Sequence, residues 1–251
     1  MSERLIAPLR TARDRARFAF WVSRVRLELK RRGARLVLDA PEGARFDTPP
    51  VFEAIPAGTG DATFTLRLGR GVSLGRDLII DVHAGATNVL ELGDGVYFKA
   101  GNRIQLRGGA IRLGARCNVR DHVELRSSGE LTAGEDVPFS NGVMVHCTER
   151  ITFEDKVGLA ERVSVLDTDH QADGSDAHFY EQPLKIAPVT IGRNTFVAAN
   201  AVVLCGARIG RNCVVAANAV VGEGDHPAGH VLAGLPARPV KRLSGAPADP
   251  V

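Results

Sequence analysis

Aliphatic residues recur every six positions along the C-terminal half of the chain. Between residues 191 and 221 they stand at Ile191, Val197, Val203, Ile209, Val215 and Val221. A period of six fits neither the 3.6-residue period of a helix nor the two-residue alternation of one long strand. Three short strands joined by corners would use 18 residues per coil, and each strand would point one aliphatic side chain inward. The pattern therefore predicts a solenoid of short strands.

A longer repeat supports this interpretation. IGRNTFVAANAVV (191–203) and IGRNCVVAANAVV (209–221) match at 11 of 13 positions and start 18 residues apart. Gly192, Gly210 and the Asn residues of these segments suit corners that need unusual backbone angles. Looser copies precede them and predict about seven coils in all. These copies begin at Leu74, Leu92, Leu113, Ala133 and Phe153.

The repeat is interrupted at VSVLDTDHQADGSDAHFYEQP (163–183), which holds two histidines and five acidic residues. The repeats that start at Phe153 and Ile191 are 38 residues apart, 20 more than one coil requires. We therefore expect a loop inserted around residues 166–188 that projects from the solenoid. Long ordered loops often carry functional residues, and a surface loop without a function is the alternative.

The first 35 residues differ from the rest in charge. They hold 11 Lys/Arg and three Asp/Glu, a net charge of +8 in a chain of +3, so the remainder carries −5. Residues 4–32 predict a basic amphipathic helix, because apolar side chains recur at helical spacing. Two interpretations stay open: packing against the protein itself, or contact with an anionic membrane surface. We expect no nucleic-acid partner, because no recognised motif accompanies the basic residues. The helical apolar positions are Phe18, Val22, Val25 and Leu29.

Composition indicates the fold class and the cellular compartment to be expected. Aromatic residues make up 5% of the chain and glycine is frequent, which favours short strands and tight corners over a helical bundle. No apolar run approaches a membrane span, and no signal peptide is evident. The four cysteines form no CxxC pair, so we expect free thiols in a reducing cytoplasm. A peripheral position at the inner membrane face would follow if the helix binds lipid.

The segment VTIGRNTFVAANAVVLCGARIGRNCVVAANAVV (189–221), followed by AGLPARPVKRL (233–243), resembles the hexapeptide-repeat acyltransferases. It is most similar to sugar O-acetyltransferases of the galactoside/maltose type. The resemblance implies a mainly β fold, a left-handed parallel β-helix, preceded here by the N-terminal amphipathic α-helix. It also implies a homotrimer with active sites between subunits, acetyl-CoA as donor and a carbohydrate acceptor.

The predicted domain organisation has four parts. They are the helix (1–35), a cap or transition segment (36–72), the β-helix with its inserted loop (73–225), and a C-terminal tail near the coenzyme A site (226–251).

The resemblance places the general base of the family at His170, in LDTDHQ. A sugar hydroxyl is a poor nucleophile at neutral pH, and an imidazole can remove its proton as the oxygen attacks the thioester. Asp167 and Asp169 would fix the ring tautomer or hold the acceptor. His178, in the same loop, is expected to be a solvated side chain.

Further site residues follow from the same resemblance. FSNGVMVHCTERITF (139–153) aligns with the coil that lines the acceptor pocket, which makes Ser140, Asn141 and His146 candidates. The donor would lie along the last coils, with its pantetheine arm at Ala199 and Ala217. Gly222 and Glu223 stand where the family often has a Thr–Lys pair, so one phosphate partner is replaced. The expected phosphate contacts are Arg238 and Lys241.

Three alternatives to O-acetylation stay open. An amino-sugar N-acetyltransferase is the close variant, and a non-catalytic solenoid is another. A γ-type carbonic anhydrase would bind zinc through histidines. His122, His146 and His170 are spaced by 24, which puts them at different corner positions, so we expect no metal.

Overall fold

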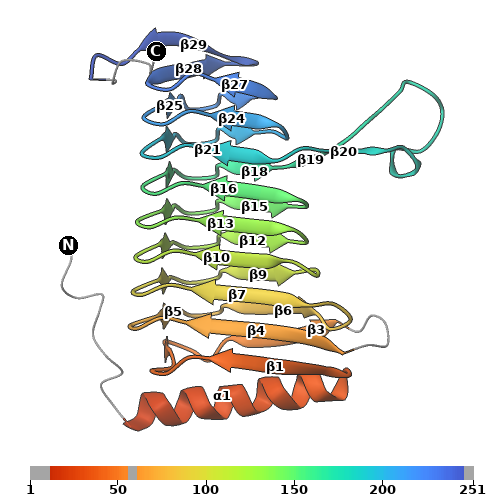
Figure 1. Ribbon diagram of the computed structural model, residues 1–251, viewed down its shortest axis with the longest axis vertical. Coiled ribbons are helices and arrows are strands. Elements are labelled where there is room, and N and C mark those ends of the chain that lie inside the picture. Colours follow the sequence, from red (N-terminus) through yellow and green to blue (C-terminus); the bar gives the residue numbers. More distant parts are fainter. Residues whose placement is uncertain (1–11, 56–60, 246–251) are drawn as a thin grey trace.

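A computed structural model describes residues 12–55 and 61–245 of the chain. They form one helix at the base of a tall three-sided β-solenoid, with one arm projecting from its side (Figure 1). Each side is a sheet whose strands come from successive coils, which we name sheets A, B and C. Eight complete coils and a partial ninth are present, against about seven predicted. The solenoid is mainly β, as predicted, and its hexapeptide repeat fits a left-handed β-helix.

The strands of the three sheets pair in parallel from coil to coil. Sheet A holds β1 Ala34–Asp39, β4 Ala62–Leu68, β7 Asn88–Leu92, β10 Ala110–Leu113, β13 Glu130–Ala133, β16 Arg150–Phe153, β21 Val189–Ile191, β24 Ala207–Ile209 and β27 Gly224–His226. Sheet B holds β2 Arg45–Phe46, β5 Ser73–Leu74, β8 Tyr97–Phe98, β11 Asn118–Val119, β14 Pro138–Phe139, β17 Gly158–Leu159, β22 Phe196–Val197, β25 Val214–Val215, β28 His230–Gly234 and β29 Ala237–Arg242. Sheet C holds β3 Val51–Ile55, β6 Ile79–His83, β9 Arg103–Leu106, β12 Glu124–Ser127, β15 Met144–Cys147, β18 Ser164–Leu166, β23 Val202–Val203 and β26 Val220–Val221.

The core is built from columns of inward-pointing side chains. In sheet A, Ile111, Leu131, Ile151 and Val189 lie in register on successive coils, and all are fully buried. The period-six residues continue such columns, because each inward position repeats on the next coil. Burial of these aliphatic side chains is the main source of stability in the solenoid.

Two residue types make the corners of the last coils possible, for different reasons. Asparagine takes the left-handed position at four of these corners, with φ of 58° at Asn194 and 59° at Asn200, and Gly206 takes it at another with φ of 77°. Gly192 needs no such angle. A Cβ there would lie 2.6 Å from the backbone nitrogen of Arg211 on the next coil, so the coils can stack closely only without a side chain. The expectation of unusual angles therefore holds for the asparagines and is corrected for this glycine.

The solenoid begins earlier than the repeat pattern predicts. Residues 34–55 form the first coil and β4 opens the second, within the segment expected as a cap or transition. The strand β4 has seven residues and alternates between inward and outward positions. Long strands of this kind follow a two-residue period, so a search for the six-residue signature does not detect them.

The helix α1 Ala12–Arg31 lies across the base of the solenoid (Figure 1). Its predicted apolar positions are all buried, and Trp21 is buried beside them. The rings of Trp21 and Phe46 are 5.5 Å apart, and the indole N–H of Trp21 donates to the Pro50 carbonyl at 2.8 Å. One apolar face of the helix thus closes the open end of the core. Residues 4–11 of the predicted helix lie outside the described residues.

Candidate functional site

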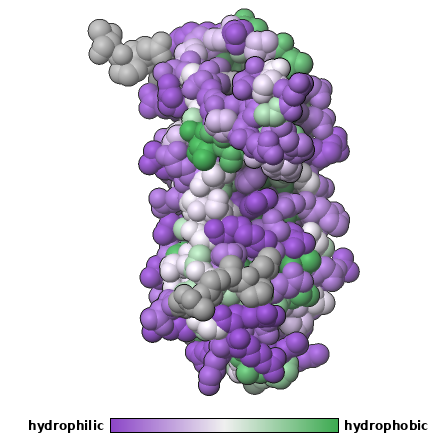
Figure 2. All heavy atoms as spheres, turned by 90° about the vertical axis from the view of Figure 1, so that its right-hand side faces the viewer, coloured by the Kyte–Doolittle hydropathy of each residue, from purple (hydrophilic) through white to green (hydrophobic). Residues whose placement is uncertain are grey.

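An arm leaves the solenoid between β18 and β21, at the segment where the repeat is interrupted (Figure 1). It contains the antiparallel pair β19 Thr168–His170 and β20 Leu184–Ile186, and a 3-10 turn, η1 Phe179–Glu181. The backbone N–H of Ala187 donates to the Asp167 carbonyl at 3.0 Å, which closes the base of the arm. The face from which the arm projects is mostly hydrophilic, with a hydrophobic patch in its upper half (Figure 2), and the arm exposes the apolar side chains of Phe179, Leu184 and Ile186.

His170 lies on the arm against two aromatic rings. Its ring centroid is 5.1 Å from that of Phe179 and 5.5 Å from that of Tyr180, with nearly perpendicular planes in both cases. His178 stacks on Phe179 at 4.7 Å, and its Nδ1 accepts a hydrogen bond from the Tyr180 backbone N–H. Edge-to-face packing of this kind restricts the orientation of an imidazole while leaving it accessible. His170 itself is exposed.

Asp167 has a different set of partners from those expected. Its buried carboxylate accepts hydrogen bonds from the backbone N–H groups of Thr148, Glu149 and Arg150, at 2.6, 2.8 and 2.8 Å. These bonds tie the base of the arm to a corner of the coil below. In the described contacts, Asp167 therefore organises the backbone, and its oxygens are directed to that corner rather than to the His170 ring.

Asp169 is exposed on β19 and lies opposite Lys185 of β20. Lys185 forms an ion pair with Glu223 of the last corner, with Nζ and Oε2 2.6 Å apart. The hydrogen bond from Lys185 lowers the pKa of the Glu223 carboxylate below its ordinary value. The negative charge of Glu223 is thus compensated by a cation of the arm.

Four candidate residues lie at the corner between sheets B and C. Asn141, Ala199 and Ala217 occupy equivalent positions on the fifth, seventh and eighth coils, and Ser140 precedes Asn141. Backbone hydrogen bonds between coils fix this column, among them one from Asn218 N–H to the Ala199 carbonyl at 3.1 Å. The Asn141 side-chain oxygen accepts from the Asp121 backbone N–H at 3.2 Å. The column is partly exposed and carries only small side chains on its upper coils.

His146 points outward from sheet C, one coil below the strand that leads into the arm. Burial lowers the pKa of its imidazole, Arg126 lowers it further, and Asp167 opposes the shift. The ring is therefore neutral at pH 7 and can accept a proton. Its backbone carbonyl accepts from the Asp167 N–H at 3.4 Å, so these two candidates are neighbours.

The predicted phosphate contacts lie at the top of the solenoid. Arg238 and Lys241 are exposed on β29, which pairs antiparallel with β28 at the end of sheet B. Gly222 lies on the opposite edge of sheet C from Ala217, and its carbonyl is 3.0 Å from Nε2 of His226. The expected donor residues are therefore divided between two edges.

Within a single chain, the candidate base and the candidate donor column lie at different edges of sheet C. The arm with His170 leaves sheet C at its edge with sheet A, whereas Asn141, Ala199 and Ala217 line its edge with sheet B. Sequence reasoning missed Phe179, Tyr180 and Lys185 as neighbours of the base. The adjacent aromatic pair in a chain with few aromatic residues was the available signal.

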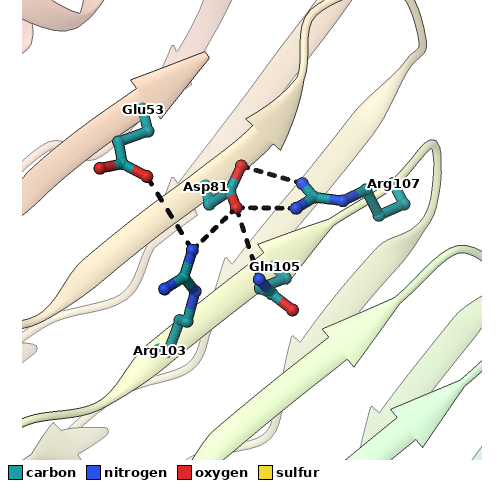
Figure 3. A network of polar contacts seen from close by, with 5 residues as sticks. All are labelled: Glu53, Asp81, Arg103, Gln105 and Arg107. Atoms are coloured by element: carbon teal, nitrogen blue, oxygen red, sulfur yellow. Dashed lines mark hydrogen bonds and ion pairs between the residues drawn. The ribbon is translucent and has the colours of Figure 1, made fainter. Parts of the chain in front are cut away.

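A second polar cluster lies lower on sheet C (Figure 3). Burial raises the pKa of the Asp81 carboxyl, but hydrogen bonds from Arg107 and Arg103 outweigh it and hold the pKa below its ordinary value. Arg107 reaches both carboxylate oxygens, at 2.9 and 2.7 Å, and Arg103 also lies 3.9 Å from Glu53. The cluster joins three successive coils, and its charges are mutually compensated.

Within residues 12–55 and 61–245, no three His, Cys, Asp or Glu side chains gather as metal ligands. The four cysteines are free and buried. Within the described residues, no helix combines the length and the apolar character needed to cross a membrane.

The three-sided coils and the six-residue repeat define a hexapeptide-repeat β-helix fold. Residues 188–223 match the family model described as Bacterial transferase hexapeptide (six repeats), which confirms the predicted resemblance to the hexapeptide transferases. No curated protein matches the chain.

Two solved structures share the fold. The polySia-specific acetyltransferase NeuO is 16% identical, over 84% of this chain and 87% of that chain, with a TM-score of 0.52. The N-acyltransferase AntD from Bacillus cereus, in complex with dTDP and coenzyme A, is 16% identical, over 57% and 78%, with a TM-score of 0.50. At these identities the likeness is one of fold.

Proposed function

We propose that the protein is an acetyl-CoA-dependent O-acetyltransferase acting on a hydroxyl of a sugar or glycan. The observation that carries the proposal is His170, held on a dedicated arm beside coils that match a transferase hexapeptide model. The relatives in fold support the chemistry, since NeuO is named as an acetyltransferase and AntD was solved with coenzyme A.

The proposed reaction is a direct transfer. The acceptor oxygen attacks the thioester carbonyl while His170 takes its proton, the C–S bond breaks, and coenzyme A leaves as the thiol after receiving that proton. The contacts of His170 with Phe179 and Tyr180 would keep the ring oriented. Backbone N–H groups near Ala199 and Ala217 would stabilise the oxyanion.

A homotrimer is part of the proposal. His170 and the small-residue column lie on different edges of sheet C, so one chain does not assemble both. An arm that reaches a neighbouring copy would supply the base to that copy's donor column. Cyclic closure of three copies gives three equivalent sites of this kind. Arg238 and Lys241 are exposed cations suited to the phosphates of the donor.

The test is release of free thiol from acetyl-CoA against a panel of sugar acceptors. His170→Ala should lower turnover by ~10²–10⁴-fold, the usual contribution of a positioned general base. His178→Ala is the matched control on the same arm, and it should cost much less. Near wild-type turnover of His170→Ala would remove the assignment.

The nature of the product distinguishes the second candidate function. An amino-sugar N-acetyltransferase would form an amide that resists hydroxylamine, whereas an O-acetyl ester is cleaved by it. AntD, an N-acyltransferase, shares the fold and gives this alternative its support.

A further inference from the structure

The helix at the base of the solenoid has a second, outward face. Its inward face is fully used, because Phe18, Trp21, Val22, Val25 and Leu29 are buried against the first coil. On the opposite side Phe20 is 66% exposed and Leu27 is 50% exposed. Seven residues separate them, which places them on one stripe of the helix surface. The stripe is not needed for packing.

Basic side chains flank this stripe on both sides. At 100° per residue, Arg13, Arg24 and Arg31 lie within about 60° of the stripe on one side and Lys30 lies about 60–80° away on the other, whereas Arg15 and Arg26 stand farther round, towards the buried face. All six are exposed. The two acidic residues of the helix, Asp14 and Glu28, are half-buried, and Glu28 pairs with Arg31 and Arg32. An outward apolar stripe with cations on both sides, denser here on the side of Arg13, Arg24 and Arg31, is the pattern of helices that lie at an anionic lipid surface.

A groove of about 320 Å³ continues this surface along one flank of the helix. It lies between α1 and residues 49–52, and its lining combines apolar side chains with Arg24, Arg31 and one acid, Glu28, which pairs with Arg31. Such a groove suits a phosphate headgroup with the first part of its acyl chain. The lining includes Phe20, Arg24, Leu27, Arg31, Val51 and Phe52.

We propose that the outward face of α1 docks the protein end-on onto an anionic bilayer. Another copy of the chain is a poorer occupant, because two such faces would bring like charges together. The other end of the solenoid is also basic, with Arg238 and Lys241 exposed on β29, which disfavours head-to-tail stacking. Nucleic acid would leave Phe20 and Leu27 without apolar contacts.

End-on docking fixes the height of the arm above the membrane. The helix lies across the solenoid axis and the arm leaves the sixth coil (Figure 1). Five coil steps of about 4.8 Å each, with about 10 Å for the helix, put the base of the arm roughly 30–35 Å above the headgroups. This consequence rests on the proposed function: the acceptor would be an extended, lipid-linked glycan, modified several sugars away from the lipid.

Vesicle binding tests the docking without any assay of turnover. The full chain should sediment with vesicles of phosphatidylcholine and phosphatidylglycerol, and not with phosphatidylcholine alone. Arg13→Glu/Arg24→Glu should weaken binding more than tenfold, since each reversal replaces attraction by repulsion. Arg76→Glu/Arg120→Glu, on exposed corners of the solenoid, is the matched control and should weaken it much less. Phe20→Ser/Leu27→Ser should weaken the binding that remains at high salt.

Fluorescence energy transfer to labelled lipid headgroups tests the orientation. The native cysteines are buried, so Ser175→Cys on the arm and Ser244→Cys near the top can be labelled selectively. End-on docking predicts weak transfer from the arm and weaker transfer from the top. Equal transfer from both labels would overturn the end-on orientation. Absence of vesicle binding, or stronger binding to DNA than to vesicles, would overturn the docking surface and leave the proposed acetyl transfer untouched.

Discussion

Some residues fix the base of the arm to the solenoid, and others are exposed on the arm itself. Asp167 lies beside the candidate base in the sequence, and from sequence its role cannot be told from catalysis. The structure shows three backbone N–H donors on its carboxylate. Because a carboxylate is acceptor-only, it suits three converging donors better than an amide does. The sequence also could not reveal that the Phe179 and Tyr180 rings pack on His170, because that contact depends on how the arm folds back.

Asp167→Asn should therefore destabilise the protein by at least about 2 kcal/mol, because its amide N–H₂ would face N–H donors in a buried position. Urea unfolding measures the change. Asp169→Asn, two residues along and exposed, is the control and should change stability little. Equal effects of the two substitutions would contradict the assigned role.

The buried thiols predict a pH dependence. Burial raises the pKa of Cys117 and of Cys147 to about 12. Both thiols stay protonated in the folded protein at pH values where the unfolded chain ionises them. The contribution of the protonated thiols to the free energy of unfolding is complete below the ordinary thiol pKa. It is lost between about pH 9 and pH 12, by up to about 1.4 kcal/mol per pH unit for each thiol. Urea midpoints from pH 8 to 10.5 should fall, and should fall less in Cys117→Ala/Cys147→Ala. A decline of the same steepness in that variant would exclude the thiols as its cause.

At the scale of elements, sequence periodicity succeeds where each coil carries the same signature. The hexapeptide coils and the interruption between Phe153 and Ile191 are visible because an apolar side chain returns at each inward position at a constant spacing. The first coils are missed because longer strands such as β4 bury alternate residues and carry no six-residue signature. The partner of Glu223 is missed because Lys185 stands 38 residues away, on an arm whose course no local pattern fixes.

The Lys185–Glu223 ion pair should hold the base of the arm against the last coils of the solenoid. Glu223→Lys places two cations together and should release the base of the arm, which limited proteolysis within 171–183 would report as faster cleavage. The charge-swapped Lys185→Glu/Glu223→Lys should restore protection. Because Glu223 is exposed and Lys185 is partly exposed, the effect should diminish at high salt. Unchanged cleavage of Glu223→Lys at low salt would show that other contacts hold the arm.

At the scale of the whole molecule, the proposed homotrimer has a mass of about 80 kDa, three times the 26.8 kDa chain, which light scattering can measure. Complementation tests whether sites lie between copies. His170→Ala loses the base and Ala217→Trp blocks the donor column, so each variant alone should be inactive. A random one-to-one mixture should recover about a quarter of wild-type turnover if the arm serves a neighbour, because each mixed trimer then holds one intact site of three. No recovery from verified mixed trimers would place base and donor on the same chain.

The helix across the base also prevents further strand pairing at that end of the solenoid. A parallel solenoid ends in strands whose N–H and C=O groups lack a neighbour, and such edges template further pairing. At the base of this molecule α1 covers the cross-section of the core with five buried side chains. At the other end the β28–β29 hairpin turns antiparallel and stops the parallel stack. A chain stripped of α1 would expose an apolar cross-section and a complementary strand edge together. Because the hairpin still closes the other end, two such chains would be prone to pair base to base, so the helix prevents edge-to-edge association as well as covering the core.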